Sequence, residues 1–246
     1  MRLYPFVPHP FVLEPPFVSD GIVSENETIQ FRLILIGRGM EFFPYFLYTF
    51  VEMGKTGLGK QRIPFVVQEV IDQHGKVIYQ DGSDVIQPLP EPMEFVVSDR
   101  NDYNSNSLTI EFETPLRMTH NNKQAKEFVF SSFLGAALRR LSSLAYFHQG
   151  FELSLNFRGL LDKAQKIEVH KENSYYQPFK RYSARQKKEM DLGGIMGRFT
   201  LFGDLSPFIS ILRAGEILHV GKGTSFGLGK YRIVENAKKW KGAERI

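Results

Sequence analysis

The chain has 246 residues, enough to bury one large core or two small ones, and its hydrophobic share of 42% suits a folded globular protein. It contains no cysteine, which excludes disulfides, thiolate metal sites and cysteine nucleophiles. Prolines interrupt the first residues, and the longest aromatic-rich stretch, Phe42 to Val51, is too short to cross a bilayer. We therefore expect a cytoplasmic protein without a membrane partner.

The net charge of +4 conceals strong segregation along the chain. Residues 68–113 carry ten acidic and two basic side chains, whereas residues 158–190 carry nine basic and four acidic ones. The segment from Lys222 to the C-terminus carries seven basic and two acidic side chains. Clustered positive charge suits a polyphosphate partner, although the charge taken alone favours a solvated basic face that aids solubility.

One eight-residue motif occurs twice. Thr56–Ile63 reads TGLGKQRI and Phe226–Ile233 reads FGLGKYRI. Each copy follows a predicted strand and a predicted helix, and each leads into a further strand. The first copy has its strand, helix and final strand at 31–38, 41–53 and 63–70, and the second at 198–205, 207–219 and 231–234. The chain therefore contains a duplicated unit of strand, helix, glycine loop and strand.

The residues before the second copy complete a familiar arrangement. Leu108–Thr114 alternates like a half-buried strand, Lys126–Phe147 has the apolar stripe of a long amphipathic helix, and Phe151–Phe157 alternates again. From about Ser105 the order is therefore β-α-β-β-α-β, that of a ferredoxin-like domain.

The fold class predicted for the whole chain is α+β, with tandem ferredoxin-like (RRM-like) domains. We predict a partial N-terminal domain at residues 1–104, entered through a proline-rich segment, and a C-terminal domain at residues 105–246. The first copy lacks a preceding β-α-β unit. Another polypeptide could complete it, the natural start could lie upstream, or the N-terminal segment could substitute for the missing part.

The glycine loops resemble phosphate-binding loops only superficially. Gly54–Lys60 has P-loop spacing, but Gln61 replaces the Ser or Thr that holds magnesium, and a strand follows where a helix is needed. In the longer second loop, glycines allow backbone N–H groups to approach an anion, although they could also serve only a tight connection. The predicted contacts there are Gly221, Lys222, Gly223, Thr224, Ser225, Gly227, Gly229 and Lys230.

Several motifs together resemble one known family. The run His219–Tyr231 (HVGKGTSFGLGKY) resembles the glycine-rich loop of the repeat-associated RNA-binding superfamily, and Arg181–Gln186 (RYSARQ) resembles the C-terminal domain of the CRISPR-associated Cas6 endoribonucleases. Thr114–Arg117, Arg139–Leu141 and Pro10–Pro16 fit the same family. This resemblance implies that CRISPR repeat RNA is the partner and is cut to guide length without a metal or other cofactor. The ribose 2′-hydroxyl would attack the adjacent phosphate and leave a 2′,3′-cyclic phosphate.

Such chemistry needs a base and an acid, and histidine suits both roles because it titrates near working pH. Catalytic candidates are His219, which directly precedes the glycine loop, His9 in the proline-rich entry and His120 in a polar turn. Each could instead be structural: a helix-end histidine, an entry residue or a plain turn residue. Family members often carry the catalytic histidine early in the first domain, where this chain departs from the pattern.

The segment Tyr175–Tyr182 mixes aromatic and basic side chains. Such a mixture suits single-stranded RNA, because bases stack on the rings and phosphates bind Lys and Arg. We predict RNA contacts at Arg181, Tyr182 and Arg185. The same tyrosines could pack on the sheet instead. Three functions stay open: a repeat-RNA endoribonuclease, a non-cleaving RNA-binding subunit working with other CRISPR-associated proteins, and a ferredoxin-like ligand-binding protein without an RNA role.

Overall fold

The structure is a computed structural model that describes residues 7–16, 23–25, 27–98, 106–120, 123–183 and 188–234; the side chains of 181–183, 188 and 190 lie outside the description. The chain forms two compact units, one of Met1–Ile34 with Phe95–Ile246 and the other of Leu35–Glu94. This division differs from the predicted boundary between residues 104 and 105, because the N-terminal segment groups with the C-terminal domain. Among the described helices, none is long and apolar enough to cross a membrane.

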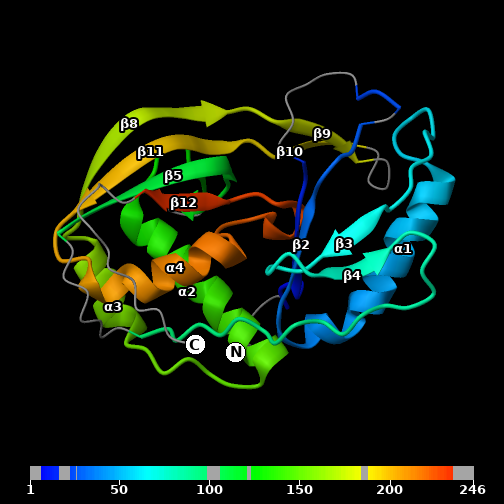
Figure 1. Cartoon of the computed structure of the whole chain (residues 1–246). Coiled ribbons are helices and arrows are strands. Elements are labelled where there is room, and N and C mark those ends of the chain that lie inside the picture. Colours follow the sequence, from blue (N-terminus) through cyan, green and yellow to red (C-terminus); the bar gives the residue numbers. More distant parts are fainter. Residues whose placement is uncertain are drawn as a thin grey trace. The chain divides into compact units, whose positions relative to one another are not determined.

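The larger unit is built on a four-stranded antiparallel sheet with the order β12-β5-β11-β8 (Figure 1). Its strands are β5 (Ser107–Leu116), β8 (Glu168–Gln177), β11 (Gly194–Phe202) and β12 (Tyr231–Val234). With α2 between the first two strands and α4 between the last two, the chain order is β-α-β-β-α-β. The predicted ferredoxin-like fold is therefore confirmed.

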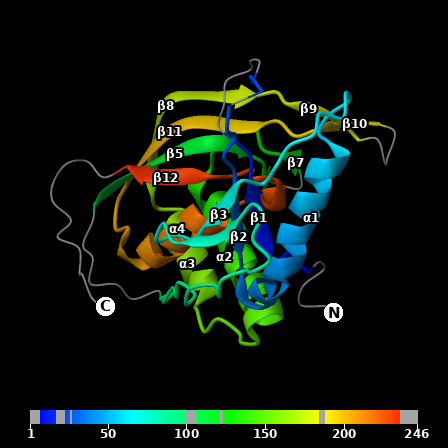
Figure 2. The same ribbon diagram turned by 45° about the vertical axis from the view of Figure 1, so that its right-hand side comes forward.

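The helices of this unit are α2 (Phe130–Leu144), α3 (Phe157–Ala164) and α4 (Ile209–Leu218). Helix α2 continues into the π-helical turn η2 (Ala145–Gln149), and the 3-10 turn η3 (Ser206–Phe208) precedes α4. In α2 the buried side chains recur at helical spacing, so one stripe faces the sheet. Figures 1 and 2 show α2 and α4 side by side on one face of the sheet.

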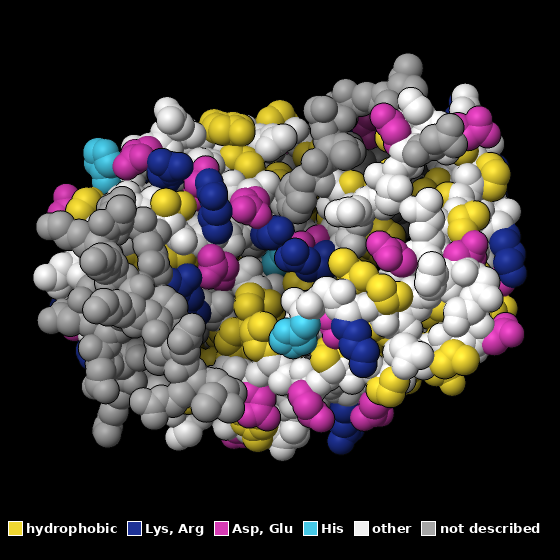
Figure 3. Space-filling model, viewed as in Figure 1, with side chains coloured by type: hydrophobic (Ala, Val, Ile, Leu, Met, Phe, Trp, Pro, Cys, Tyr) yellow, Lys and Arg dark blue, Asp and Glu magenta, His cyan; other side chains and the backbone are white. Residues whose placement is uncertain are grey.

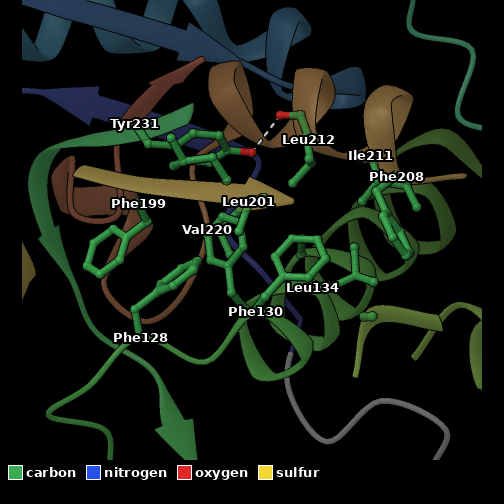
Figure 4. Close-up of a cluster of buried hydrophobic side chains, with 14 of the residues drawn as sticks. Phe128, Phe130, Leu134, Phe199, Leu201, Phe208, Ile211, Leu212, Val220 and Tyr231 are labelled. Carbon is green, nitrogen blue, oxygen red and sulfur yellow. Dashed lines mark hydrogen bonds between the residues drawn. The ribbon is translucent and has the colours of Figure 1, made fainter. Parts of the chain in front are cut away.

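The core lies between this sheet and the two helices. Phe199 and Leu201 of β11 and Tyr231 of β12 are fully buried against Phe130 and Leu134 of α2 (Figure 4). The hydroxyl of Tyr231 donates a hydrogen bond to the carbonyl oxygen of Leu212 in α4, which satisfies the one polar atom that this ring brings into the core. This bond joins the first half of α4 to β12, and the glycine loop connects the C-terminal end of α4 to the same strand.

The second strand of this domain is not the predicted one. Residues 151–156 form no strand, and Phe157 begins α3, whose N-cap Asn156 accepts a hydrogen bond from the backbone N–H of Gly159 at 2.9 Å. The role is taken by β8, a long edge strand whose mostly polar sequence shows no apolar alternation.

The smaller unit contains the 3-10 turn η1 (Gly37–Phe42), the helix α1 (Phe43–Thr56), and the hairpin of β3 (Glu69–Ile71) with β4 (Val77–Gln80). Its buried cluster consists of Phe43, Leu47 and Ile78. The predicted strand at 63–70 is mostly absent: Ile63 makes an isolated bridge to Leu58, and β3 begins only at Glu69.

The N-terminal segment adds a strand to the larger unit. Strand β1 (Phe11–Glu14) pairs with β2 (Arg32–Leu35), whose first three residues belong to the same unit. The larger unit also contains two hairpins. One pairs β6 (Thr119–His120) with β7 (Lys123–Gln124), and the other pairs β9 (Lys180–Ser183) with β10 (Lys188–Asp191).

Candidate nucleic-acid interface

The glycine-rich loop, residues 220–229, connects α4 to β12 and contains the 3-10 turn η4 (Thr224–Phe226). Its backbone is held by the protein itself. The N–H of Val220 donates to the carbonyl of Gly229 at 3.1 Å, and the N–H of Lys222 donates to the carbonyl of Arg117 at 2.7 Å. The N–H of Gly229 donates to the carbonyl of Pro115 at 3.1 Å. These amides are therefore occupied and do not point at a phosphate.

The glycines of the loop serve close packing. Gly221, Gly223, Gly227 and Gly229 all have positive φ. A Cβ at Gly229 would lie 1.8 Å from the carbonyl oxygen of Val220, and one at Gly221 would lie 2.4 Å from that of Arg117. No side chain fits at either distance, so the structure favours the tight-connection interpretation for these glycines.

The exposed part of the loop is small. Lys222 is exposed, and within the described part of the chain no ion pair neutralises it. Phe226 is 55% exposed, Ser225 is half-buried, and Thr224 is buried. A cation and an aromatic ring on one short loop are the side chains that contact the phosphates and bases of single-stranded RNA.

Lys230 has a different environment. Its ammonium group lies 3.1 Å from Glu14 Oε2 and 3.3 Å from Glu113 Oε2, and the side chain is only 17% exposed. Two carboxylates already neutralise this charge. The structure therefore favours an internal role for Lys230 over the predicted phosphate contact.

His219 is completely buried. Its Nε2 lies 2.9 Å from Glu14 Oε1, and its Nδ1 lies 3.2 Å from the carbonyl oxygen of Leu228. The ring faces the protein interior and not a bound substrate. This geometry favours a structural role over the predicted catalytic one. Nothing in the sequence signals that Glu14, 205 residues earlier, is the partner of His219.

The other two predicted catalytic histidines are exposed. His9 lies before β1, with its ring centroid 5.5 Å from that of Phe11. His120 lies in β6, and its Nδ1 is 2.7 Å from the hydroxyl of Ser132. Both rings can reach a ligand from solvent.

The predicted contacts in the basic segment are only partly described. Arg181 and Tyr182 belong to β9, but their side chains lie outside the described part of the chain, as does Arg185 altogether. Their RNA contacts stay predictions.

A polar cluster at the base of the β9–β10 hairpin has no counterpart in the sequence analysis. Gln124 Nε2 donates to the hydroxyl of Tyr176 at 2.7 Å and to the carbonyl of Gly193 at 3.1 Å. Burial and the nearby charge of Asp191 raise the pKa of Tyr176, so its hydroxyl stays protonated. The Nε atom of Arg117 is buried and has no hydrogen-bond partner among the described residues. Two motifs signalled this region, Thr114–Arg117 and Tyr175–Tyr182, but neither predicted the contact with Gln124.

The open face of the sheet carries balanced charge. Arg198 of β11 and Arg232 of β12 both bind the carboxylate of Glu111 in β5, at 3.1 and 2.8 Å. Figure 3 shows basic and acidic side chains interspersed over these strands. Over the described ranges, no group of three His, Asp or Glu side chains is placed to hold a metal ion.

Comparison with known families assigns the larger domain. Residues 110–231 match the family model described as CRISPR-associated endoribonuclease Cas6. The chain belongs to the Cas6 family. A second family model, described only as an N-terminal domain, matches residues 1–91. Membership in the Cas6 family supports endonucleolytic processing of CRISPR repeat RNA.

Solved structures share the fold at low sequence identity. A Thermus thermophilus Cas6 product complex has a TM-score of 0.60 and 17% identity, covering 92% of this chain and 82% of its own. A partial Cas6-RT-Cas1–Cas2 complex has a TM-score of 0.58 and 16% identity, covering 97% of this chain and 40% of its own. No curated protein gives a significant match.

Proposed function

We propose that this Cas6 protein binds CRISPR repeat RNA against the tip of its glycine-rich loop and cuts it without a metal ion. The observation that supports binding there is the exposed pair of Lys222 and Phe226 on a loop whose backbone is fixed by the protein. The ammonium group of Lys222 would bind phosphate, and the ring of Phe226 would stack on a base.

In the proposed cleavage the ribose 2′-oxygen forms a bond to the adjacent phosphorus, and the bond from phosphorus to the 5′-oxygen breaks. A base takes the 2′-hydroxyl proton, and an acid gives a proton to the departing 5′-oxygen. The products are a 2′,3′-cyclic phosphate and a 5′-hydroxyl. The burial of His219 leaves His9 and His120 as our candidates for these proton transfers.

The test is incubation of the full chain in EDTA with repeat RNA from the CRISPR array of its own genome, analysed on a denaturing gel. We expect one cut that leaves a cyclic phosphate. Replacing the acting histidine, His9→Ala or His120→Ala, should slow cleavage by about 10²- to 10⁴-fold without loss of binding. His74→Ala, an exposed histidine of the smaller unit, is the matched control.

The buried position of His219 also supports a second candidate, a non-cleaving RNA-binding subunit that works with other CRISPR-associated proteins. Association of a Cas6 with Cas1 and Cas2 is named for one of the structurally similar complexes. Binding without cleavage in the same assay would favour this subunit. If the protein neither bound nor cut the RNA, both proposals would be rejected.

A further inference from the structure

One carboxylate links the two ends of the glycine-rich loop. Glu14, in β1, is only 4% exposed. Its Oε1 lies 2.9 Å from Nε2 of His219, the residue immediately before the loop. Its Oε2 accepts a hydrogen bond at 3.1 Å from Nζ of Lys230, the residue immediately after the loop. Glu14 is therefore a cross-link between the two positions where the loop begins and ends.

The backbone of β1 packs on the same loop. A Cβ at Gly227 would lie 2.6 Å from Cδ of Pro15 and 2.9 Å from the carbonyl oxygen of Leu13. From the other side, the hydroxyl of Thr114 donates to the carbonyl of Gly227 at 2.8 Å and accepts from the N–H of Lys230 at 2.8 Å. The loop is thus enclosed between β1 and the end of β5, with only its tip exposed.

The two ring nitrogens of His219 connect β1 to the loop. Nδ1 lies 3.2 Å from the carbonyl oxygen of Leu228, inside the loop, and Nε2 lies 2.9 Å from Oε1 of Glu14. Burial raises the pKa of Glu14, but hydrogen bonds from His219 and Lys230 lower it to about 2, so its carboxylate is an acceptor at neutral pH.

Neighbouring cations balance the carboxylates beside the loop. Arg32 Nη1 of β2 lies 3.7 Å from Glu14 Oε2, and Glu113 of β5 binds Lys230 at 3.3 Å. The carboxylates of Glu14 and Glu113 thus meet the cations of Lys230 and Arg32.

We propose that Glu14 and His219 are positioning residues, which clamp the glycine-rich loop in the conformation that presents Lys222 and Phe226. The part of this inference that concerns RNA rests on the proposed function. The clamp itself can be tested on the protein alone, so the two can fail separately.

The first test uses the wild-type protein with ¹⁵N-labelled histidine. The buried contact of Nε2 with Glu14 predicts a ring N–H of His219 that exchanges with solvent far more slowly than that of the exposed His74. The His219→Gln spectrum identifies the signal. A ring N–H of His219 that exchanges as fast as that of His74 would overturn the clamp.

The second test measures hydrogen exchange of the loop. Glu14→Gln keeps the shape of the side chain but removes its charge, and we expect the amides of Val220, Lys222 and Gly229 to exchange about tenfold faster. The amides of α2 should be unchanged. Glu113→Gln, which removes the other carboxylate beside Lys230, is the matched control and should leave the loop near wild type. Equal effects of the two variants, or no effect of Glu14→Gln, would overturn the proposal.

The third test measures the affinity for labelled repeat RNA from the same array. Weaker binding by Glu14→Gln, by about five- to tenfold, with Glu14→Asp restoring part of it, supports the positioning role. A looser loop with unchanged affinity would overturn that role. If wild-type protein fails to bind this RNA while exchange still shows the clamp, the proposed function is wrong and the clamp stands.

Discussion

His219 occupies a backbone conformation that few side chains adopt. At φ 59° and ψ 158° it lies in a region used almost entirely by glycine, and such a residue costs about 1–3 kcal/mol. A glycine here would remove this strain, but it would also remove the donor to Glu14. The strained position therefore indicates that the imidazole is needed. The adjacent glycine motif drew attention to His219, but only the fold places Glu14 against it.

The pH dependence of stability should reveal the clamp at the level of single residues. Because the pKa of Glu14 is lowered from 4.5 to about 2 in the folded protein, its carboxylate stabilises the fold above about pH 4.5. That contribution is lost as the pH falls toward 2. We expect Glu14→Gln to lower the free energy of unfolding by about 2–3 kcal/mol at neutral pH and by less than half of that near pH 3.

Urea unfolding of both proteins at the two pH values measures this difference. Glu127→Gln is a suitable control, because Glu127 pairs with Lys171 on the surface and such pairs contribute about 0–1 kcal/mol. A Glu14→Gln effect that stays the same from neutral pH to pH 3 would contradict the pKa assignment.

At the level of elements, the repeated motif and the hydrophobic periodicity located most of the ferredoxin-like domain. The predicted helix at 126–147 corresponds to α2, and the strand at 198–205 largely to β11. The alternation at 151–157 was misleading, because these residues lead into a capped helix. Strand β8 could not be recognised, since an exposed edge strand has no apolar alternation to detect.

The position of the candidate loop could be predicted from the sequence, but the contacts inside the loop could not. Glycine spacing marked residues 220–229, and Lys222 of this loop is exposed, but its phosphate contact stays a prediction. Whether the amides face an anion or the protein depends on contacts with Pro115 and Arg117, which are distant in sequence. Sequence spacing carries no information about such contacts.

Replacing two glycines with alanine distinguishes the free-energy cost of lost close packing from the cost of backbone strain. A Cβ at Gly229 (φ +72°) would lie 1.8 Å from the carbonyl oxygen of Val220. A Cβ at Gly150 (φ +81°) would have no atom within 4 Å. Gly150→Ala should cost about 1–2 kcal/mol from the backbone alone. Gly229→Ala should cost at least about 2 kcal/mol more, because the loop must also move apart. Urea unfolding measures both, and equal costs would show that close packing at Gly229 is unimportant.

At the level of the whole molecule, the two units differ in how they are stabilised. In the larger one, the described core contains buried side chains of α2, α3, α4, β5, β11 and β12, whereas the buried cluster of the smaller one is Phe43, Leu47 and Ile78. Since hydrophobic burial is the main favourable term in folding, the smaller unit should open first. Glu14 belongs to the larger unit although it precedes the smaller one in sequence.

Matched core truncations test this order of unfolding. Leu47 of α1 and Leu134 of α2 are both buried, and Leu→Ala at such positions costs about 2–5 kcal/mol. By hydrogen exchange, Leu47→Ala should expose the amides of α1 while those of α2 and of residues 220–229 keep their protection. Leu134→Ala should reduce protection of α2 and of the loop together. If Leu47→Ala removed protection from the loop as strongly as Leu134→Ala, the chain would unfold as one cooperative body, and the clamp would depend on the smaller unit as well.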